Sequence, residues 1–216
     1  MLDFEYVIVG KMRVNCYFVF CTETMRGIII DPGANLNIIT STVDKIGMKP
    51  EAVVLTHAHF DHSAHADDLR KKYKIPLVIH EMEAGVLKDP YMNLSLSFTN
   101  SPISVEADVL VKDNEEITVG NSKLNVIYTP GHTRGGMSLY SEGILFSGDT
   151  LFCGSHGRTD FPTGDAFVLA ESIKRLFMLP DDTEVYAGHG ESTTIGNEKT
   201  SNYLVKALLE MNNGRT

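Results

Sequence analysis

Cysteine is scarce in this sequence, and no two cysteines form a recognisable pair. The chain has three in 216 residues, Cys16, Cys21 and Cys153, and no Cys-x-x-Cys spacing. An odd and scattered set argues against a framework of disulfide bonds. Cys16 and Cys21 lie in an apolar run typical of a strand, so we expect both to be small buried side chains. Cys153 has no base beside it in the sequence, and we expect it to be buried and structural as well.

Long apolar segments, an excess of positive charge and linker-like stretches are also missing. No run approaches the ~20 apolar residues of a membrane-spanning helix, and the N-terminus MLDFEYVIVG carries acids where a signal peptide has basic side chains. The formal net charge of −9 argues against binding to nucleic acids or anionic membranes. We therefore expect a cytoplasmic protein that binds neither nucleic acids nor membranes. Because no Pro-rich or Ser-rich linker and no repeat divides the chain, we predict a single domain over residues 1–216.

The apolar pattern alternates between strand-like and helix-like segments. Strands are expected over 2–9, 14–21, 27–30, 52–55, 76–79, 109–111, 117–119, 123–128, 136–140, 143–147 and 185–187. Helices are expected over 35–46, 65–73, 81–87, 166–177 and 196–211. The segment 88–108 is rich in Asn, Ser and Pro and is expected to be a loop, either a wall of the site or a tolerated insertion. Together these elements predict an α/β fold with helices around a core of sheet.

Side chains that can bind a metal gather directly after the apolar run 52–55. They are His57, His59, Asp61 and His62, in a loop between a buried strand and a helix. Such loops are the usual place for a site in an α/β protein. Imidazole suits zinc and iron, and a carboxylate adds an anionic ligand. A run of surface histidines without a role is plausible for one histidine, but not for three with an aspartate, so the loop predicts a metal site.

Three more glycine-containing turns follow strand-like runs and carry similar side chains. They place His132 in TPGHT, Asp149 in SGDT and His189 in AGHG. In this order HAHFDH, GHT, SGDT and GHG resemble the metallo-β-lactamase superfamily, with further likeness at Asn15 and in the Asp-Pro-Gly turn at Asp31. The segment GRTDFP over 157–162 is similar to the small, single-domain branch of type II glyoxalases. The resemblance implies a four-layer αββα sandwich, with the metal site at one edge of two sheets packed face to face.

The resemblance also implies two divalent metal ions. Zinc is the expected metal, and the same ligands would also accept iron or manganese. The ligands of the first would be three histidines: His57, His59 and His132. The ligands of the second would be Asp61, His62 and His189. Asp149 would bridge both, and with Asp61 it would orient the nucleophile. Histidine at position 59, where the diiron flavoproteins of the superfamily have glutamate, indicates the hydrolase type.

Several polar residues near these turns need a separate interpretation. Asp31 is a candidate for an outer hydrogen bond to a ligand histidine, and the alternative is an Asx turn before Pro32. The remaining histidines are not predicted to be ligands. We expect His65 to be partly exposed on a helix, His80 to face solvent at the end of a strand, and His156 to lie in a loop.

The resemblance implies hydrolysis of an acyl bond in a small-molecule substrate. The leading hypothesis is a thioesterase acting on hydroxyacyl thioesters similar to S-lactoylglutathione. Arg158 is predicted to bind the substrate, and the alternative is an arginine that holds its own loop through Asp160 or Asp165. The short segment after His189, with Lys199, Lys206 and Arg215, has few basic residues to hold glutathione, so the thiol carrier stays open.

Other functions remain open at this point. A persulfide dioxygenase, with a single iron held by two histidines and an aspartate, keeps the HxHxDH pattern and has a similar GRTDF segment. The residues that follow, Pro162, Gly164 and Asp165, favour the small glyoxalase branch. A lactonase or another ester hydrolase would have the same ligands, whereas a nuclease fits the acidic charge poorly. A metal-binding protein without catalysis is disfavoured, because seven ligands with a bridging carboxylate exceed what a structural metal needs. The sequence does not indicate an oligomeric state.

Overall fold

Two six-stranded β-sheets form the middle of the structure, a computed structural model that describes residues 1–213. The first sheet has the order β1 (Leu2–Val9), β2 (Val14–Cys21), β3 (Arg26–Ile30), β4 (Lys49–Val54), β5 (Leu77–His80) and β6 (Val109–Val111). The second has the order β14 (Thr193–Thr194), β13 (Glu184–Ala187), β10 (Ile144–Gly148), β9 (Met137–Ser141), β8 (Ser122–Tyr128) and β7 (Glu116–Val119). A small hairpin pairs β11 (Leu151–Phe152) with β12 (Ser155–His156).

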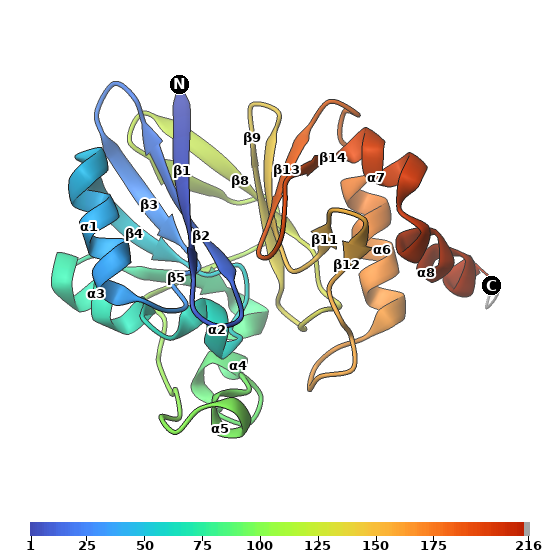
Figure 1. The fold of residues 1–216 in the computed structure, drawn as a ribbon, viewed down its shortest axis with the longest axis horizontal. Helices are drawn as coiled ribbons and strands as arrows, with labels where there is room; N and C mark the ends of the chain where they lie inside the picture. Colours follow the sequence, from blue (N-terminus) through green and yellow to red (C-terminus); the bar gives the residue numbers. More distant parts are fainter. Residues whose placement is uncertain (214–216) are drawn as a thin grey trace.

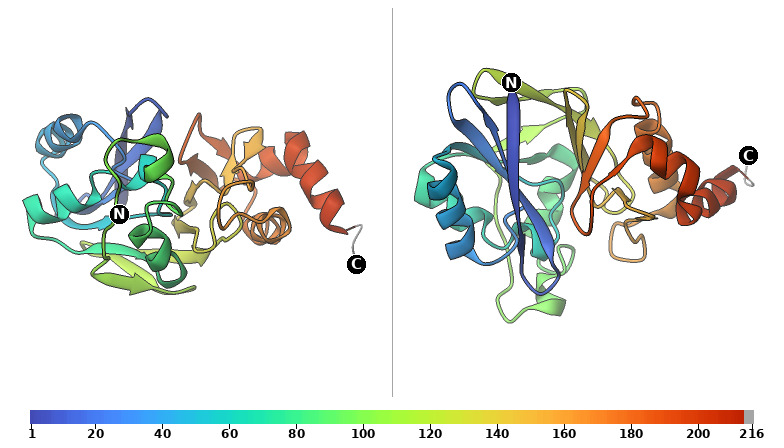
Figure 2. Two further views of the ribbon diagram at one scale, coloured as in Figure 1. Left: turned by 90° about the horizontal axis from the view of Figure 1, so that it is seen from below. Right: turned by 45° about the horizontal axis from the view of Figure 1, so that its top comes forward.

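Helices cover the outer face of each sheet (Figures 1 and 2). Beside the first sheet lie α1 (Leu36–Ile46), α2 (Phe60–Ser63), α3 (Ala66–Tyr73), the 3₁₀ turn η1 (Glu81–Glu83), α4 (Ala84–Lys88) and α5 (Ser95–Phe98). Beside the second lie α6 (Ala166–Leu176), α7 (Ile195–Ser201) and α8 (Tyr203–Asn213). The predicted four-layer αββα sandwich is therefore confirmed. Among residues 1–213, none of these helices is both long and apolar enough to span a membrane.

The apolar core between the sheets comes from alternate residues of facing strands. Tyr17 and Ile30 of the first sheet belong to the same buried cluster as Val126, Leu139 and Phe146 of the second. Side chains alternate between the faces of a strand, so the other residues of the same strands face the helices. Strand β2 is consequently buried along its whole length, as its continuous apolar run predicts.

The direction of the strands brings several loops to one edge of the sandwich. Strands β3, β4, β5 and β6 run parallel, and β10 runs parallel to β13. The carboxyl ends of β3 and β4 therefore lead to Asp31 and to the histidine-rich loop, and those of β10 and β13 lead to Asp149 and His189. Parallel strands place such loops side by side, which is where sites form in α/β folds.

The predicted strands and helices are confirmed, with small shifts at their ends, and some short elements were not predicted. Strands β11, β12 and β14 have two residues each, too few to show a pattern. The helix expected over 196–211 is two helices, separated at Asn202. The Asn202 amide donates to Oε2 of Glu198 at 2.6 Å and to the carbonyl of Ser155 at 3.0 Å, and its oxygen accepts from the N–H of Val205 at 2.9 Å. The last of these bonds takes the place of the helical backbone bond from Val205 to the carbonyl of Ser201.

The segment 88–108 is mainly a loop, as expected, interrupted by α5. The buried side chain of Asn93 fastens it by donating to the carbonyls of Leu87 at 3.2 Å and Ile103 at 2.9 Å. The backbone carbonyl of Asn93 accepts from the N–H of Phe60, which begins α2. The segment is thus a fixed neighbour of the histidine-rich loop rather than a free insertion.

Candidate metal centre

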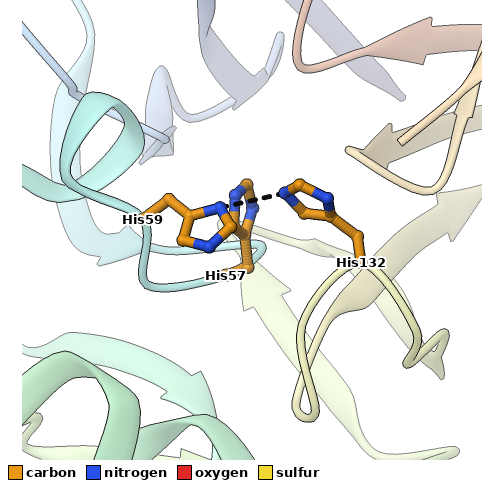
Figure 3. Close-up of side chains that lie close together, drawn as sticks. All are labelled: His57, His59 and His132. Atoms are coloured by element: carbon orange, nitrogen blue, oxygen red, sulfur yellow. Dashed lines mark hydrogen bonds between the residues drawn. The ribbon is translucent and has the colours of Figure 1, made fainter. Parts of the chain in front are cut away.

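Three histidines from two loops converge at the edge where the sheets meet. His57 and His59 precede α2, and His132 lies in the turn after β8 (Figure 3). Nε2 of His132 lies 2.9 Å from Nδ1 of His59. The ring of His57 lies 4.8 Å from each of the other two rings, measured between centroids. The ligand atoms of the three lie within 4.8 Å of one another, so this group could hold a metal ion.

A second group lies beside the first and adds a carboxylate. Asp61 and His62 belong to α2, and His189 follows β13. Nε2 of His62 lies 3.2 Å from Nε2 of His189, which lies 3.5 Å from Oδ2 of Asp61. These atoms also lie within reach of a single cation. The structure therefore brings together both sets of residues that the sequence predicted.

Asp149 lies between the two groups, at the end of β10. Its Oδ1 lies 3.5 Å from Nε2 of His62, and its Oδ2 lies 3.5 Å from Nε2 of His132. His189 is also near, with Nε2 at 3.6 Å from Oδ2. The carboxylate thus faces a histidine of each group, which is the position of a bridging ligand.

Several polar atoms of the cluster are buried without a partner. Within the cluster they are Nε2 of His57 and Oδ1 of Asp149; Nε2 of His59 is unpartnered too, but the nitrogen of that ring that faces His132 is Nδ1. Buried polar atoms almost always have a hydrogen-bond partner, so the two atoms are suited to hold a cation. Both are nitrogen or oxygen donors of the kinds that bind divalent cations. The residues present therefore fit a metal centre.

The electrostatics of the cluster also favour a bound cation. Burial and the neighbouring imidazoles lower the pKa of His57 and His59, which keeps both neutral, as a metal ligand must be. Burial alone would lower the pKa of His62 as well. The carboxylates of Asp149, Asp61 and Asp31 outweigh that effect and raise this pKa to about 10. Without a cation, a proton on His62 supplies the positive charge that these carboxylates attract.

Hydrogen bonds from outside the cluster hold its rings in place. Nδ1–H of His132 donates to the carbonyl of Arg158 at 2.7 Å, and Nδ1–H of His189 donates to the carbonyl of Met12 at 3.0 Å. Nδ1–H of His57 donates at 3.1 Å to the hydroxyl of Thr56. These bonds leave Nε2 of each ring free to face the centre, as is usual for metal-binding histidines.

Asp31 supplies the corresponding bond to His62. Oδ2 of Asp31 lies 3.0 Å from Nδ1 of His62 and also accepts from the Thr56 hydroxyl at 2.6 Å. Oδ1 accepts from the Thr56 N–H at 2.8 Å. The side chain is therefore used on the histidine-rich loop and not in an Asx turn. The expected hydrogen bond from a predicted ligand histidine to Asp31 is confirmed.

Glu83 is a residue of the site that the sequence did not reveal. It is fully buried in the turn η1, where Oε1 accepts from the N–H of Ala58 at 3.0 Å and Oε2 accepts from the N–H of Gly135 at 2.7 Å. Ala58 lies between His57 and His59, and Gly135 lies just beyond His132, so the carboxylate connects the two loops of the first group. Burial raises the pKa of Glu83 to about 7.

Asn15 and Tyr17 of β2 form hydrogen bonds to the loop that contains His189. The Asn15 amide donates to the carbonyls of Ala187 and Gly190, each at 3.0 Å, and the Tyr17 hydroxyl donates to Ala187 at 2.5 Å. A buried asparagine within a strand is the signal that could have identified this role. The turn is also tight, because a Cβ atom at Gly188 would lie 2.2 Å from Oδ1 of Asp149. Only glycine fits there.

A cavity of about 330 Å³ opens beside the cluster. Its wall opposite the histidines and carboxylates is apolar and consists of Met12, Phe60, Leu94, Phe98, Phe152 and Phe161. Arg158 also lines the cavity, but its guanidinium donates to both carboxylate oxygens of Asp160, at 2.7 and 2.6 Å. The arginine therefore holds its own loop, and binding of substrate by Arg158 stays a prediction.

Three expectations about single residues were wrong. His156 is not in a loop: it belongs to strand β12, where it pairs with Leu151, and it lines the cavity. His80 does not face solvent: it is buried, and its ring stacks on Tyr128 of the second sheet at 4.4 Å between centroids. Cys153 is not buried, because it lies in the tight turn of the β11–β12 hairpin, where its thiol is exposed. His65 is partly exposed beside Asp68, as expected, and Cys16 and Cys21 are buried.

A two-sheet sandwich with a buried histidine and aspartate cluster at its edge defines a class of protein, the metal-dependent hydrolases of this fold. The chain belongs to the metallo-beta-lactamase superfamily, because the model of that family matches residues 9–189. It is 35% identical over 198 residues to the probable metallo-hydrolase YqgX of Bacillus subtilis (strain 168), covering 90% of this chain and 93% of that protein. It is 31% identical over 211 residues to hydroxyacylglutathione hydrolase GloC of Haemophilus influenzae, covering 93% and 97%.

Solved structures show the same relationship. The crystal structure of the BLEG-1 B3 metallo-beta-lactamase superposes with a TM-score of 0.88 at 37% identity, over 93% of this chain and 98% of that chain. TTHA1623, in a di-iron-bound form, superposes with a TM-score of 0.82 at 30% identity, over 92% and 98%. The protein is thus a metallo-hydrolase of this superfamily, and its cluster is a site for divalent metals.

Proposed function

We propose that this protein hydrolyses small-molecule thioesters at a centre of two divalent cations. The two sets of ligands would be His57, His59 and His132 for one cation and Asp61, His62 and His189 for the other. The position of Asp149 carries the proposal, because its carboxylate oxygens lie 3.5 Å from histidines of both sets. A carboxylate in that position can bridge two cations and offset part of their mutual repulsion.

Two such cations, when bound, lower the pKa of a shared water towards 7 and polarise the acyl carbonyl of a substrate. The protein's own carboxylates then orient the water. Burial on its own would raise the pKa of Asp61, but His62 and His189 outweigh it and hold this pKa below its ordinary value. Asp61 and Asp149 line the same cavity, so both can accept a hydrogen bond from the attacking water and direct its lone pair to the acyl carbon.

The side chains around the cavity favour a leaving group that departs as an anion. Apart from the proposed ligands, the titratable groups that line it are His156 and Arg158. Nδ1–H of His156 donates to the carbonyl of Gly157 at 2.8 Å, which leaves its Nε2 an acceptor when the ring is neutral. Arg158 is engaged with Asp160. A thiolate, whose conjugate acid has a pKa of about 8.5, can leave without a proton donor, whereas an amine cannot.

We propose zinc as the metal, with iron as the alternative that the ligands also accept. The related TTHA1623 was solved with two irons, and GloC is named as a hydroxyacylglutathione hydrolase. The persulfide dioxygenase needs one iron, whereas this chain has both ligand groups complete. Because the dioxygenases keep the HxHxDH pattern too, the preference for hydrolysis rests on the residues after GRTDF, Pro162, Gly164 and Asp165.

Metal analysis combined with turnover tests the proposal. We expect about two metals per chain, hydrolysis of a glutathione thioester, and no oxygen uptake with glutathione persulfide. Asp149→Asn should lose metal and lower kcat about 100-fold or more, while Asp68→Asn, on an exposed helix face, should do neither. One iron per chain with oxygen uptake would support the dioxygenase instead, and hydrolysis of lactones alone would support the other ester hydrolases.

A further inference from the structure

The aromatic residues of the cavity form one continuous wall. The rings of Phe60 and Phe98 are stacked, with centroids 5.6 Å apart and an angle of 8° between planes. Phe98 meets Phe161 edge to face at 6.1 Å, and Phe161 meets the ring of His59 at 5.9 Å. On the other side, Phe152 covers His189 at 6.1 Å. The wall thus extends from both groups of the metal centre into the cavity.

Apart from the proposed metal ligands, the described lining of the cavity contains two titratable side chains, His156 and Arg158. The guanidinium of Arg158 lies 3.8 Å from the ring centroid of Phe161 and is paired with Asp160 through two hydrogen bonds. The pair is neutral as a whole, and the arginine packs on Phe161 as a cation–π partner. A carboxylate or phosphate of a substrate would have to share the guanidinium with Asp160, which already uses two of its N–H groups. The wall is therefore built for an apolar group.

The backbone of Leu94 is strained at the point where its side chain joins this apolar wall. Its backbone is left-handed, with φ 68° and ψ −1°, a conformation that suits glycine or asparagine and is strained for leucine. The side chain is buried against the cavity, and its neighbour Asn93 fixes the segment through hydrogen bonds to Leu87 and Ile103. The strained backbone therefore places the leucine side chain against the cavity.

We propose that the cavity holds the acyl group of the substrate and that this group is apolar, aliphatic or aryl, of about the size of hexanoyl or phenylacetyl. The inference rests on the proposed thioesterase function. A cavity of about 330 Å³ is at the small end of ligand sites. A large polar thiol carrier does not fit in it and extends towards solvent, whereas a compact acyl chain fits and excludes water from the scissile bond. This differs from a hydroxyacyl substrate such as lactoyl.

Kinetics with thioesters of one thiol test the inference. For acetyl, lactoyl, hexanoyl and phenylacetyl thioesters of glutathione, we expect kcat/KM to rise about threefold to fourfold for each buried methylene until the cavity is filled. Leu94→Gly relieves the strained backbone and removes the side chain. It should reduce the preference for hexanoyl over acetyl at least fivefold, and relief of the strained backbone should offset part of the stability lost with the buried side chain. Leu96→Ala is the matched control, because Leu96 lies on the same segment but is exposed and does not line the cavity.

A binding measurement separates this inference from the proposed function. S-hexylglutathione and S-(2-hydroxyethyl)glutathione cannot be hydrolysed, and calorimetric titration gives their affinities. If no thioester is cleaved, but S-hexylglutathione binds more tightly and Leu94→Gly removes the difference, the thioesterase proposal fails and the apolar site stands. Lactoyl as the preferred acyl group would overturn the inference. So would a Leu94→Gly protein that melts several degrees lower with its acyl preference intact, because Leu94 would then be only structural.

Discussion

The carboxylate of Asp31 lies 3.0 Å from Nδ1 of His62, a residue 31 positions further along the chain. The backbone of Asp31 has φ 52°, in the left-handed region and directly before Pro32, where that conformation is unfavourable. The strain is compensated by three hydrogen bonds that the buried carboxylate accepts, one from His62 and two from Thr56. The result is that Nε2 of His62 is aimed at the carboxylates of Asp61 and Asp149.

We expect Asp31→Asn to weaken metal binding about 10-fold to 100-fold, because the outer hydrogen bond that fixes the His62 ring loses its charge. Competition with a chelator of known affinity measures this change directly. Asp68→Asn is the control, since Asp68 pairs with the partly exposed His65 outside the cluster. An Asp31→Asn protein with wild-type metal affinity would show that the strained turn serves another purpose.

Glu83 should make stability depend on pH. Burial raises its pKa in the folded protein to about 7, above the value of about 4.5 in an unfolded chain. The folded state therefore holds the proton more tightly, so its contribution to stability is complete below about pH 4.5 and is lost as the pH rises through 7. The quantity to follow is the difference in the free energy of unfolding between the metal-free wild type and Glu83→Gln. We expect this difference to fall by up to about 3 kcal/mol between pH 4.5 and 8.

Urea denaturation across that pH range tests the prediction. Glu81→Gln is the matched control, because Glu81 is in the same turn but is exposed, and its difference from wild type should stay flat. A flat difference for Glu83→Gln as well would mean that Glu83 is ionised throughout and is stabilised by the N–H groups of Ala58 and Gly135 alone.

Removal of metal should lower the thermal midpoint of a single transition. We propose that the chain unfolds as one domain, because both sheets contribute to the cluster. At a free metal concentration of 100 times Kd, bound metal stabilises by about 2.7 kcal/mol for each site. For a chain of this size, that corresponds to about 5–10 °C. Calorimetry with and without chelator measures it, and two separate transitions, one insensitive to chelator, would contradict the single domain.

The thiols should differ in reactivity. Cys153 is exposed in the β11–β12 turn, while Cys16 and Cys21 are buried in β2. We expect a thiol reagent such as Ellman's reagent to modify one thiol rapidly in the native protein and all three in denaturant. Cys153→Ser should abolish the rapid phase. Rapid modification that persists in Cys153→Ser would mean that strand β2 opens far more readily than its burial indicates.

The predicted ligands, which the structure brings together, could be proposed from the sequence because their segments follow strands and have a recognisable sequence. Asp31 could be proposed for the same reason. Glu83 could not, because its partners are backbone N–H groups at Ala58 and Gly135, which any residue supplies, and only tertiary structure brings them to one carboxylate. His80 was placed wrongly because its stacking partner Tyr128 belongs to the other sheet. Pairing across layers leaves no local pattern.

Local conformation accounts for the remaining differences. The exposure of Cys153 depends on a hairpin whose strands have two residues each, too short for any periodicity. Leu94 is in a left-handed conformation that leucine rarely adopts, so nothing in the sequence marked it as part of the cavity wall. At the break, the Asn202 side chain accepts the bond from the N–H of Val205 that a continuous helix would give to the carbonyl of Ser201.

The order of the predicted ligands along the chain has a consequence for how the protein acquires metal in the cell. The first ligands follow β4, and the last, His189, follows β13. A chain synthesised from its N-terminus cannot complete the centre until almost all of both sheets has left the ribosome. During synthesis, the histidine-rich loop alone supplies only part of each predicted ligand set. The first predicted set is complete at His132, whereas the second needs His189. We therefore expect the second cation to bind only after both sheets have formed, with supply as well as affinity setting which metal enters.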